Sequence, residues 1–179
     1  MKSALIILFP DFEEIEAVST IDVLRRGGMR VVLTAINSES NVVGAHGITC
    51  IADDVRLPED LFDAVIIPGG PGVLRLRNDK ILSKFILKHY NQGKLIAAIC
   101  AAPLLLHDLG ILDKHNYTCH FSVTATLKNA QHNESVVCDK NVITACGPAA
   151  GINFGLAILK FFESIQNVRD IAYGMMCNI

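Results

Sequence analysis

The chain contains 179 residues, of which 51% are hydrophobic and 19% are charged, and its net charge is −2. This composition excludes a disordered chain, and the length allows one domain with a sizeable core. Broad nucleic-acid binding requires a positive surface field, which this charge balance does not supply. We therefore expect one domain over residues 1–179 and no nucleic-acid partner.

The amino-terminal segment is apolar, and the acidic stretch Asp11–Glu14 follows it instead of the small-residue cleavage site of a signal peptide. We interpret the segment as a buried strand. No apolar stretch approaches the length of a membrane span. The sequence therefore predicts a cytoplasmic protein without a membrane partner.

Apolar runs, periodicity and glycine or proline breaks predict strands that alternate with helices. The predicted strands are residues 4–9, 29–36, 63–67, 94–99 and 141–146, with a hairpin in 41–52 and short strands near Tyr117 and Val136. The predicted helices are residues 13–26, a segment from the glycine-rich loop to about Tyr90, and residues 101–109, 149–165 and 168–176. The expected inward face of the first helix is Ile15, Val18, Ile21 and Leu24. This alternation is typical of an α/β fold, with a doubly wound, mostly parallel sheet sandwiched between helices.

Cys100 lies where a predicted buried strand breaks directly into a helix. This turn belongs to the carboxyl edge of the sheet, where open α/β sheets bind their ligands. The unpaired N–H groups and the dipole of the following helix favour an anion there. We expect the Cys100 thiol to lose its proton more easily than a free thiol and to act as a nucleophile.

Glu16 and His120 are candidate partners of this thiol. Glu16 fits a solvated helix carboxylate, but if it faces Cys100, burial would favour its protonated form, which could shuttle a proton. For His120, one interpretation is a surface or structural histidine. The functional alternative is a general acid/base near Cys100.

The loop Pro68–Gly72 follows a predicted strand and precedes a helix. Its glycine spacing does not match a dinucleotide-binding fingerprint. The backbone N–H groups of Gly70 and Ala101 could form a two-donor oxyanion hole. The alternative is an ordinary tight turn.

The cysteine spacing indicates reduced thiols and no zinc site, because no Cys-x-x-Cys pair and no secretory signal occur. His132 and Glu134 resemble the His-x-Glu pair of class I glutamine amidotransferases, but their polar surroundings favour a surface loop. The six cysteines are Cys50, Cys100, Cys119, Cys138, Cys146 and Cys177.

Five motifs occur in order along the chain: Glu13-Glu-Ile-Glu16, Asp22-Val-Leu-Arg-Arg-Gly-Gly28, Pro68-Gly-Gly70, Ala97-Ala-Ile-Cys-Ala-Ala-Pro103 and Gly147-Pro148. As a set they resemble the ThiJ/PfpI superfamily, and within it the DJ-one-like branch that includes the protein deglycases. The resemblance runs from about residue 3 to residue 165. It implies a flavodoxin-like sandwich, usually a homodimer, that needs no metal or organic cofactor.

The resemblance also implies roles for individual residues. Cys100 matches the nucleophilic, oxidation-sensitive cysteine, Glu16 the carboxylate beside it, and His120 a histidine found in some members. The remaining matches are Gly70 and Ala101 for the backbone donors, and Arg26 and His46 for an anion pocket, where His46 replaces a second arginine. Protease activity is not expected, because alanine stands where the proteolytic relatives have a histidine directly after the cysteine.

The implied chemistry is cysteine-dependent and acts on 2-oxoaldehydes, such as methylglyoxal converted to lactate, or on early glycation adducts, with protection against oxidative stress. Cys100 would attack the aldehyde, and Glu16 and His120 would move protons through an enediol. The alternative is a redox sensor in which Cys100 is oxidised. A chaperone-like stress protein ranks last, because the sequence shows no exposed apolar stripe or disordered arm.

Overall fold

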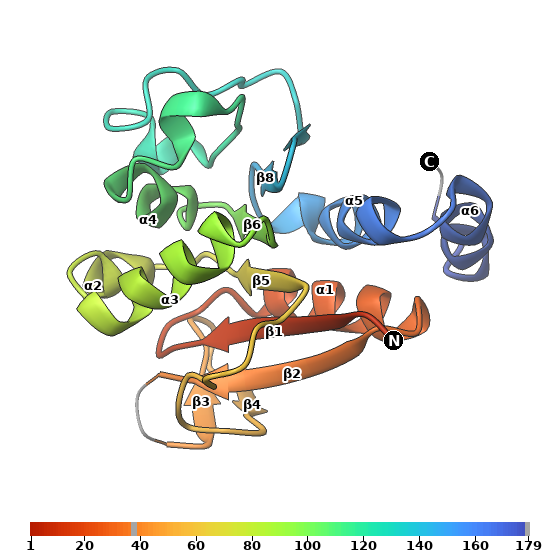
Figure 1. Cartoon of the computed structure of the whole chain (residues 1–179), viewed down its shortest axis with the longest axis horizontal. Helices are drawn as coiled ribbons and strands as arrows, with labels where there is room; N and C mark the ends of the chain where they lie inside the picture. The colour runs from red at the N-terminus through yellow and green to blue at the C-terminus, as the bar shows by residue number, and fades with distance from the viewer. Residues whose placement is uncertain (37–38, 178–179) are drawn as a thin grey trace.

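The computed structural model describes residues 1–36 and 39–177 (Figure 1). The strands are β1 (Ser3–Leu8), β2 (Arg30–Ala35), β3 (Asn41–Val43), β4 (Thr49–Ile51), β5 (Ala64–Ile67), β6 (Leu95–Ile99), β7 (Val136–Asp139) and β8 (Val142–Ala145). The α-helices are α1 (Glu14–Arg26), α2 (Val73–Leu76), α3 (Lys80–Asn91), α4 (Pro103–Asp108), α5 (Gly151–Phe162) and α6 (Ile165–Gly174). Three short 3₁₀ helices are η1 (Leu112–Lys114), η2 (Phe121–Val123) and η3 (Pro148–Ala150).

A six-stranded sheet in the order β2-β1-β5-β6-β8-β7 forms the centre of the molecule. Every neighbouring pair in it is parallel except β7 and β8, which are antiparallel. The predicted hairpin forms β3 and β4, outside this sheet. These strands confirm the predicted mostly parallel, doubly wound sheet. Their order brings the carboxyl ends of β5, β6 and β8 to adjacent positions at one edge.

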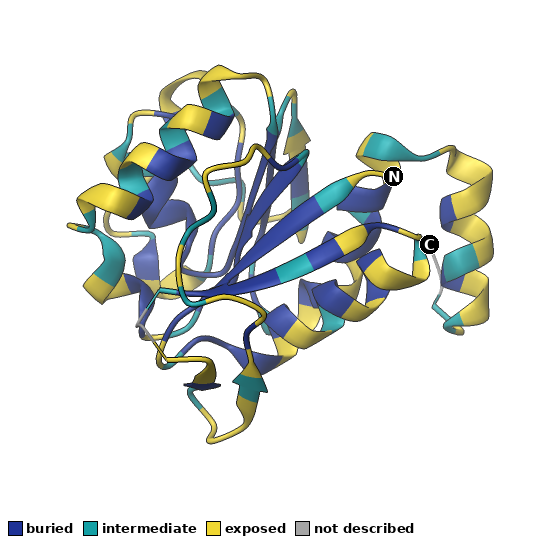
Figure 2. Ribbon diagram, turned by 60° about the horizontal axis from the view of Figure 1, so that its bottom comes forward, coloured by how far each residue is buried: buried dark blue, intermediate teal, exposed yellow. Residues whose placement is uncertain are grey.

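Helices cover both faces of the sheet (Figures 1 and 2). Helices α1 and α5 pack together on one face, while α3 and α4 contact β6 on the other. All five residues of β6 are fully buried between these layers, as a central parallel strand requires. None of the helices in the described part of the chain is long and apolar enough to cross a membrane.

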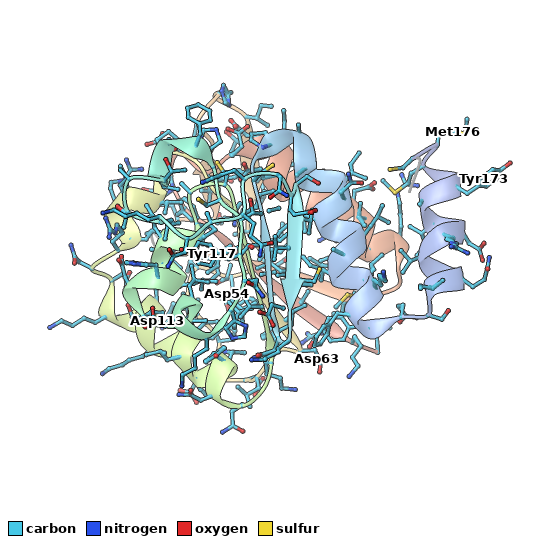
Figure 3. All side chains as sticks on the ribbon, turned by 90° about the horizontal axis from the view of Figure 1, so that it is seen from above. Asp54, Asp63, Asp113, Tyr117, Tyr173 and Met176 are labelled. Atoms are coloured by element: carbon cyan, nitrogen blue, oxygen red, sulfur yellow. The ribbon has the colours of Figure 1, made fainter. Side chains whose placement is uncertain are left out.

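Helix α6 packs against α5 and extends the molecule away from the sheet. Figure 3 shows Tyr173 and Met176 at the outer end of this helix, and their exposed fractions are 81% and 88%. The hydroxyl of Ser164 caps the helix by accepting a hydrogen bond from the Asn167 N–H at 3.2 Å. The cap explains why the helix begins at Ile165, three residues before its predicted start.

Two predicted elements differ from the observed ones. The helix expected up to Tyr90 is two helices, because Asp79 begins α3 by accepting hydrogen bonds from the N–H groups of Ile81 and Leu82. The strand expected near Tyr117 is irregular, since the Thr118 N–H donates to the Thr144 hydroxyl oxygen instead of joining a backbone ladder.

The inward face of α1 also differs from the prediction. Ile21 and Leu24 are buried, but Ile15 is 60% exposed and Val18 is 46% exposed. Because α1 packs against α5, a different set of its side chains faces inward. The first two of these side chains are acidic. The buried residues are Glu14, Glu16, Ala17, Thr20, Ile21, Val23 and Leu24. Glu16 therefore points into the molecule toward the edge where β5 and β6 end.

Candidate active site

Cys100 is held in a strained backbone conformation directly after β6. Its φ of +65° lies in the left-handed region, which costs a residue with a side chain about 1 to 3 kcal/mol. Two hydrogen bonds hold it there: its N–H donates to the Ala145 carbonyl at 2.8 Å, and its carbonyl accepts from the His120 N–H at 2.9 Å. Strain retained at one residue by neighbouring segments is typical of a functional position.

Glu16 lies beside this thiol and is 1% exposed. Its Oε2 accepts a hydrogen bond from the Gly69 N–H at 2.7 Å. A Cβ placed on Gly69 would lie 2.8 Å from Glu16 Oε2 and 3.0 Å from Cys100 Sγ, so only glycine leaves room for both groups. Gly69 was not among the predicted donors, although the glycine pair that contains it marked the loop.

The second oxygen of Glu16, Oε1, is buried and has no hydrogen-bond partner among the described residues. Burial, with a smaller contribution from the charge of Glu13, raises the pKa of Glu16 to about 7, against hydrogen bonds to Gly69 and Cys100 that lower it. The direction agrees with the prediction for a buried Glu16. A protonated carboxyl here offers its O–H to a group that enters the site.

The expected easy ionisation of the Cys100 thiol is wrong for the resting site. Burial raises the pKa of Cys100 above its usual value, and the adjacent Glu16 carboxylate raises it further. The helix that follows is short and begins only at Pro103, so its dipole does not offset burial. The pair of Cys100 and Glu16 therefore keeps at least one shared proton near neutral pH.

The N–H groups of Gly70 and Ala101 both donate toward the Cys100 sulfur and lower its pKa. The structure thus brings together the two predicted backbone donors. Gly70 has a φ of +106°, and a Cβ there would lie 2.4 Å from the Asp11 carbonyl oxygen. Only glycine can present this N–H.

His120 reaches the site through its backbone, and no hydrogen bond joins its ring to Cys100 among the described residues. The Ser122 N–H donates to His120 Nδ1, so the ring proton lies on Nε2. The ring lines a cleft of about 560 Å³ together with His132 and Cys146. His132 is exposed, as its polar surroundings predicted, yet it faces the same cleft.

The two predicted anion-binding residues lie at opposite ends of α1. Arg26 is exposed and pairs with Asp22 at 2.6 Å. It lies ten residues from Glu16 along α1, roughly 15 Å away at the helical rise per residue. His46 is surrounded by the carboxylates of Glu13 and Glu14, which repel an anion.

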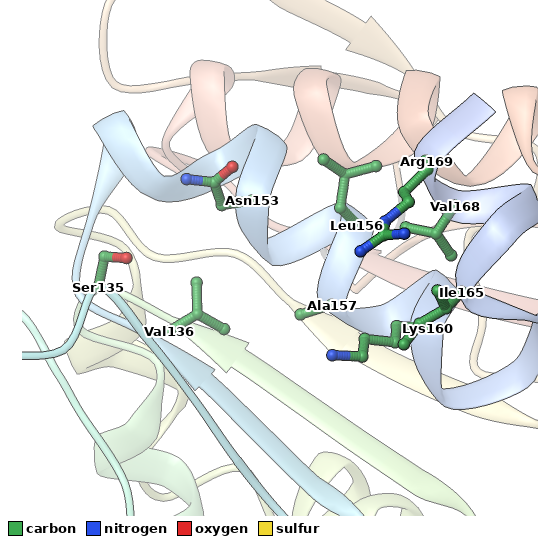
Figure 4. Close-up of a pocket in the computed structure, with 9 residues that line it drawn as sticks. All are labelled: Ser135, Val136, Asn153, Leu156, Ala157, Lys160, Ile165, Val168 and Arg169. Carbon is green, nitrogen blue, oxygen red and sulfur yellow. The ribbon is translucent and has the colours of Figure 1, made fainter. Parts of the chain in front are cut away.

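A separate cavity of about 410 Å³ lies between β7, α5 and α6 (Figure 4). Its lining is mostly apolar and includes the basic residues Lys160 and Arg169. No residue that lines it is a predicted site residue, so the candidate chemistry belongs to the sheet edge at Cys100.

Comparisons with known proteins show the family of this chain. A sequence profile described as the DJ-1/PfpI family matches residues 2–161. Protein dj-1beta of Drosophila melanogaster is 33% identical over 181 residues, which cover 98% of this chain and 97% of that protein. A Caenorhabditis elegans protein named glutathione-independent glyoxalase DJR-1.2 is 36% identical over 177 residues, which cover 95% and 94%.

Solved structures show the same fold. Oxidized DJ-1 of Toxoplasma gondii matches with a TM-score of 0.94 at 30% identity, and the match covers 100% of both chains. DJ-1beta of Drosophila melanogaster matches with a TM-score of 0.93 at 31% identity, and 99% of both chains is covered. The mostly parallel sheet flanked by helices is therefore the flavodoxin-like fold of these proteins.

Proposed function

Because the chain belongs to the DJ-1/PfpI family, which has a relative named as a glyoxalase, we propose that it converts 2-oxoaldehydes to hydroxy acids without a cofactor. Methylglyoxal is the test substrate, and lactate is its product. Early glycation adducts are a second substrate class for the same thiol. The observation that carries the proposal is the buried, unpaired Oε1 of Glu16 beside Cys100.

The first step uses the shared proton of the pair. Glu16 accepts the thiol proton while Cys100 Sγ attacks the aldehyde carbon, and the resulting oxyanion takes this proton back from Glu16 to give a hemithioacetal. The N–H groups of Gly70 and Ala101, which already point at the sulfur, lie close to the developing oxyanion. The raised pKa of Glu16 suits this task, because it lies near neutral pH.

The later steps move protons and add water. Removal of the proton from the former aldehyde carbon gives an enediol, and protonation of the neighbouring carbon leaves a thioester on Cys100. Water then hydrolyses the thioester, releasing lactate and the thiol. The aldehyde carbon is oxidised and the ketone carbon is reduced, so no outside oxidant is needed. In this proposal the Nε2–H group of His120 assists these transfers.

Lactate formation from methylglyoxal tests the proposal. We expect Cys100→Ser to abolish turnover and Glu16→Gln to lower kcat by about 100-fold or more, the range for loss of general acid/base catalysis. Cys138→Ser, on the exposed side of β7, is the matched control and should retain wild-type activity. Equal rates for Cys100→Ser and wild type would remove this thiol from the mechanism.

A second candidate function is redox sensing, and the same donors favour it. Two backbone N–H groups and a protonated Glu16 around the sulfur would stabilise a sulfinate by hydrogen bonds. After mild peroxide treatment, mass spectrometry should find the sulfinic form at Cys100 ahead of the other five cysteines. Equal oxidation across all six cysteines would contradict a sensor role.

A further inference from the structure

A second cluster of ionisable side chains lies at the start of α1, outside the proposed cysteine chemistry. Glu13 and Glu14 begin the helix, and His46 lies in the turn of the β3–β4 hairpin that packs against it. One ligand atom from each of the three residues lies within 4.8 Å of the other two. Residues more than thirty positions apart thus form one compact donor set.

The two carboxylates of this cluster are buried without a lysine or arginine partner. Glu13 is 8% exposed and Glu14 is 3% exposed. Within residues 1–36 and 39–177, neither forms an ion pair with a lysine or arginine. Glu13 is the N-cap residue of α1, yet its carboxylate makes no capping hydrogen bond. Its carboxylate forms an ion pair with His46 Nδ1 at 3.6 Å. One imidazole thus serves two buried carboxylates, which leaves the cluster an excess of negative charge that a metal cation would balance.

The spacing of the donor atoms fits a metal ion. His46 Nδ1 lies 3.0 Å from Glu14 Oε2 and 3.6 Å from Glu13 Oε1. Ligands about 2.1 Å from a zinc ion are separated from one another by roughly 3.0 to 3.5 Å in octahedral or tetrahedral geometry. The separation of 3.0 Å lies in this range, and that of 3.6 Å is slightly longer.

The Glu14 carboxylate is also held in place for this role. Its Oε1 accepts hydrogen bonds from the N–H groups of His46 and Ile48, at 2.6 and 3.3 Å, and its Oε2 lies 3.0 Å from His46 Nδ1, so a cation would bind between these two atoms. A Cβ on Gly44 would lie 2.4 Å from this carboxylate, so glycine makes the space it occupies. Hydrogen bonds that orient a ligating carboxylate are characteristic of metal sites.

We propose that Glu13, Glu14 and His46 bind one divalent transition-metal cation of the zinc type, with water completing the coordination. The imidazole ligand favours such a cation over calcium or magnesium, which prefer all-oxygen sites. Binding requires the neutral form of His46, so any proton on His46 is released to solvent. No thiol takes part, and the proposal does not depend on the reaction at Cys100.

Cobalt(II) is the probe, because its absorption spectrum reports the ligand type. We expect one cobalt ion per wild-type chain by calorimetric titration, and a spectrum without a sulfur-to-cobalt charge-transfer band. His46→Gln and Glu13→Gln should each weaken binding by at least about 10- to 100-fold, the cost of disturbing ligand support. His132→Gln, which changes another exposed histidine, and Cys100→Ser should bind cobalt like wild type.

Three results would overturn the proposal. The first is no cobalt binding by the wild-type chain. The second is binding that neither His46→Gln nor Glu13→Gln weakens, with circular dichroism showing both variants folded. The third is a sulfur-to-cobalt band that disappears in Cys100→Ser or Cys50→Ser, which would place the metal on a thiolate.

Discussion

The pair of Cys100 and Glu16 shows how one buried carboxyl serves reactivity at a cost to stability. Burial raises the pKa of both groups. Near neutral pH the pair therefore keeps a proton that a solvent-exposed glutamate would have lost. In the folded chain, the Glu16 carboxyl binds its proton more tightly than in the unfolded chain. The stability that it contributes is present below pH 4.5, its unfolded pKa, and is lost as pH rises through about 7.

Glu16→Gln should therefore stabilise the fold at alkaline pH. The amide keeps the shape and can still accept from the Gly69 N–H, but it carries no buried charge. We expect the free energy of unfolding at pH 8 to rise by about 2 to 3 kcal/mol over wild type, and the difference to shrink at pH 5. Urea denaturation at the two pH values measures it, with exposed Glu59→Gln as the control. A difference that is the same at both pH values would contradict this assignment.

At the scale of elements, helix ends depend on single capping residues. The helix expected up to Tyr90 is interrupted because Asp79 satisfies the first N–H groups of α3. The interruption separates α2, which follows the loop at Gly70, from the long helix that covers β5 and β6.

Asp79→Ala should destabilise the protein by about 1 kcal/mol, since two N–H groups at the start of α3 lose their acceptor. The free energy of unfolding from urea titration measures the change. Asp60→Ala, at an exposed loop residue, is the matched control and should change stability by less than about 0.5 kcal/mol. Equal effects of the two substitutions would show that the cap is not needed.

At the scale of the whole molecule, one sheet organises the described chain, and we infer that residues 1–179 form one domain. A patch of exposed aliphatic side chains, the α1 patch, lies on its surface and consists of Ile15, Val18, Ile48 and Ile152. Their exposed fractions are 60%, 46%, 57% and 39%. The Ile48 N–H bonds to Glu14, and a Cβ on Gly151 would lie 3.4 Å from the Ile15 carbonyl, so these segments adjoin.

We propose that a second copy of the chain covers the α1 patch in a homodimer, since clustered exposed aliphatic residues mark interaction surfaces. Ile15→Glu should convert the dimer to a monomer in sedimentation velocity, because it places a charge inside the interface. Ile81→Glu, at a 73% exposed position on α3, should remain dimeric. A wild-type chain that sediments as a monomer at all concentrations would contradict the proposal.

Local patterns in the sequence determined the strands and the position of Cys100. Continuous apolar runs and glycine breaks identified β1, β2, β5, β6 and β8, because buried parallel strands need such runs. Chain position suggested Glu16 as a partner of Cys100 and Gly70 and Ala101 as donors, and the motif resemblance implied the same roles.

Only the tertiary structure decided which way α1 faces and what surrounds each titratable group. The three-residue spacing predicted Ile15 and Val18 to be inside, but packing against α5 turned Glu14 and Glu16 inward instead. The pKa of Cys100 rises because desolvation and the Glu16 charge outweigh local N–H groups, a balance set by packing. The cluster at His46 likewise exists only because the hairpin folds onto the helix. Burial and long-range proximity are sums over distant segments, so local sequence patterns do not contain them.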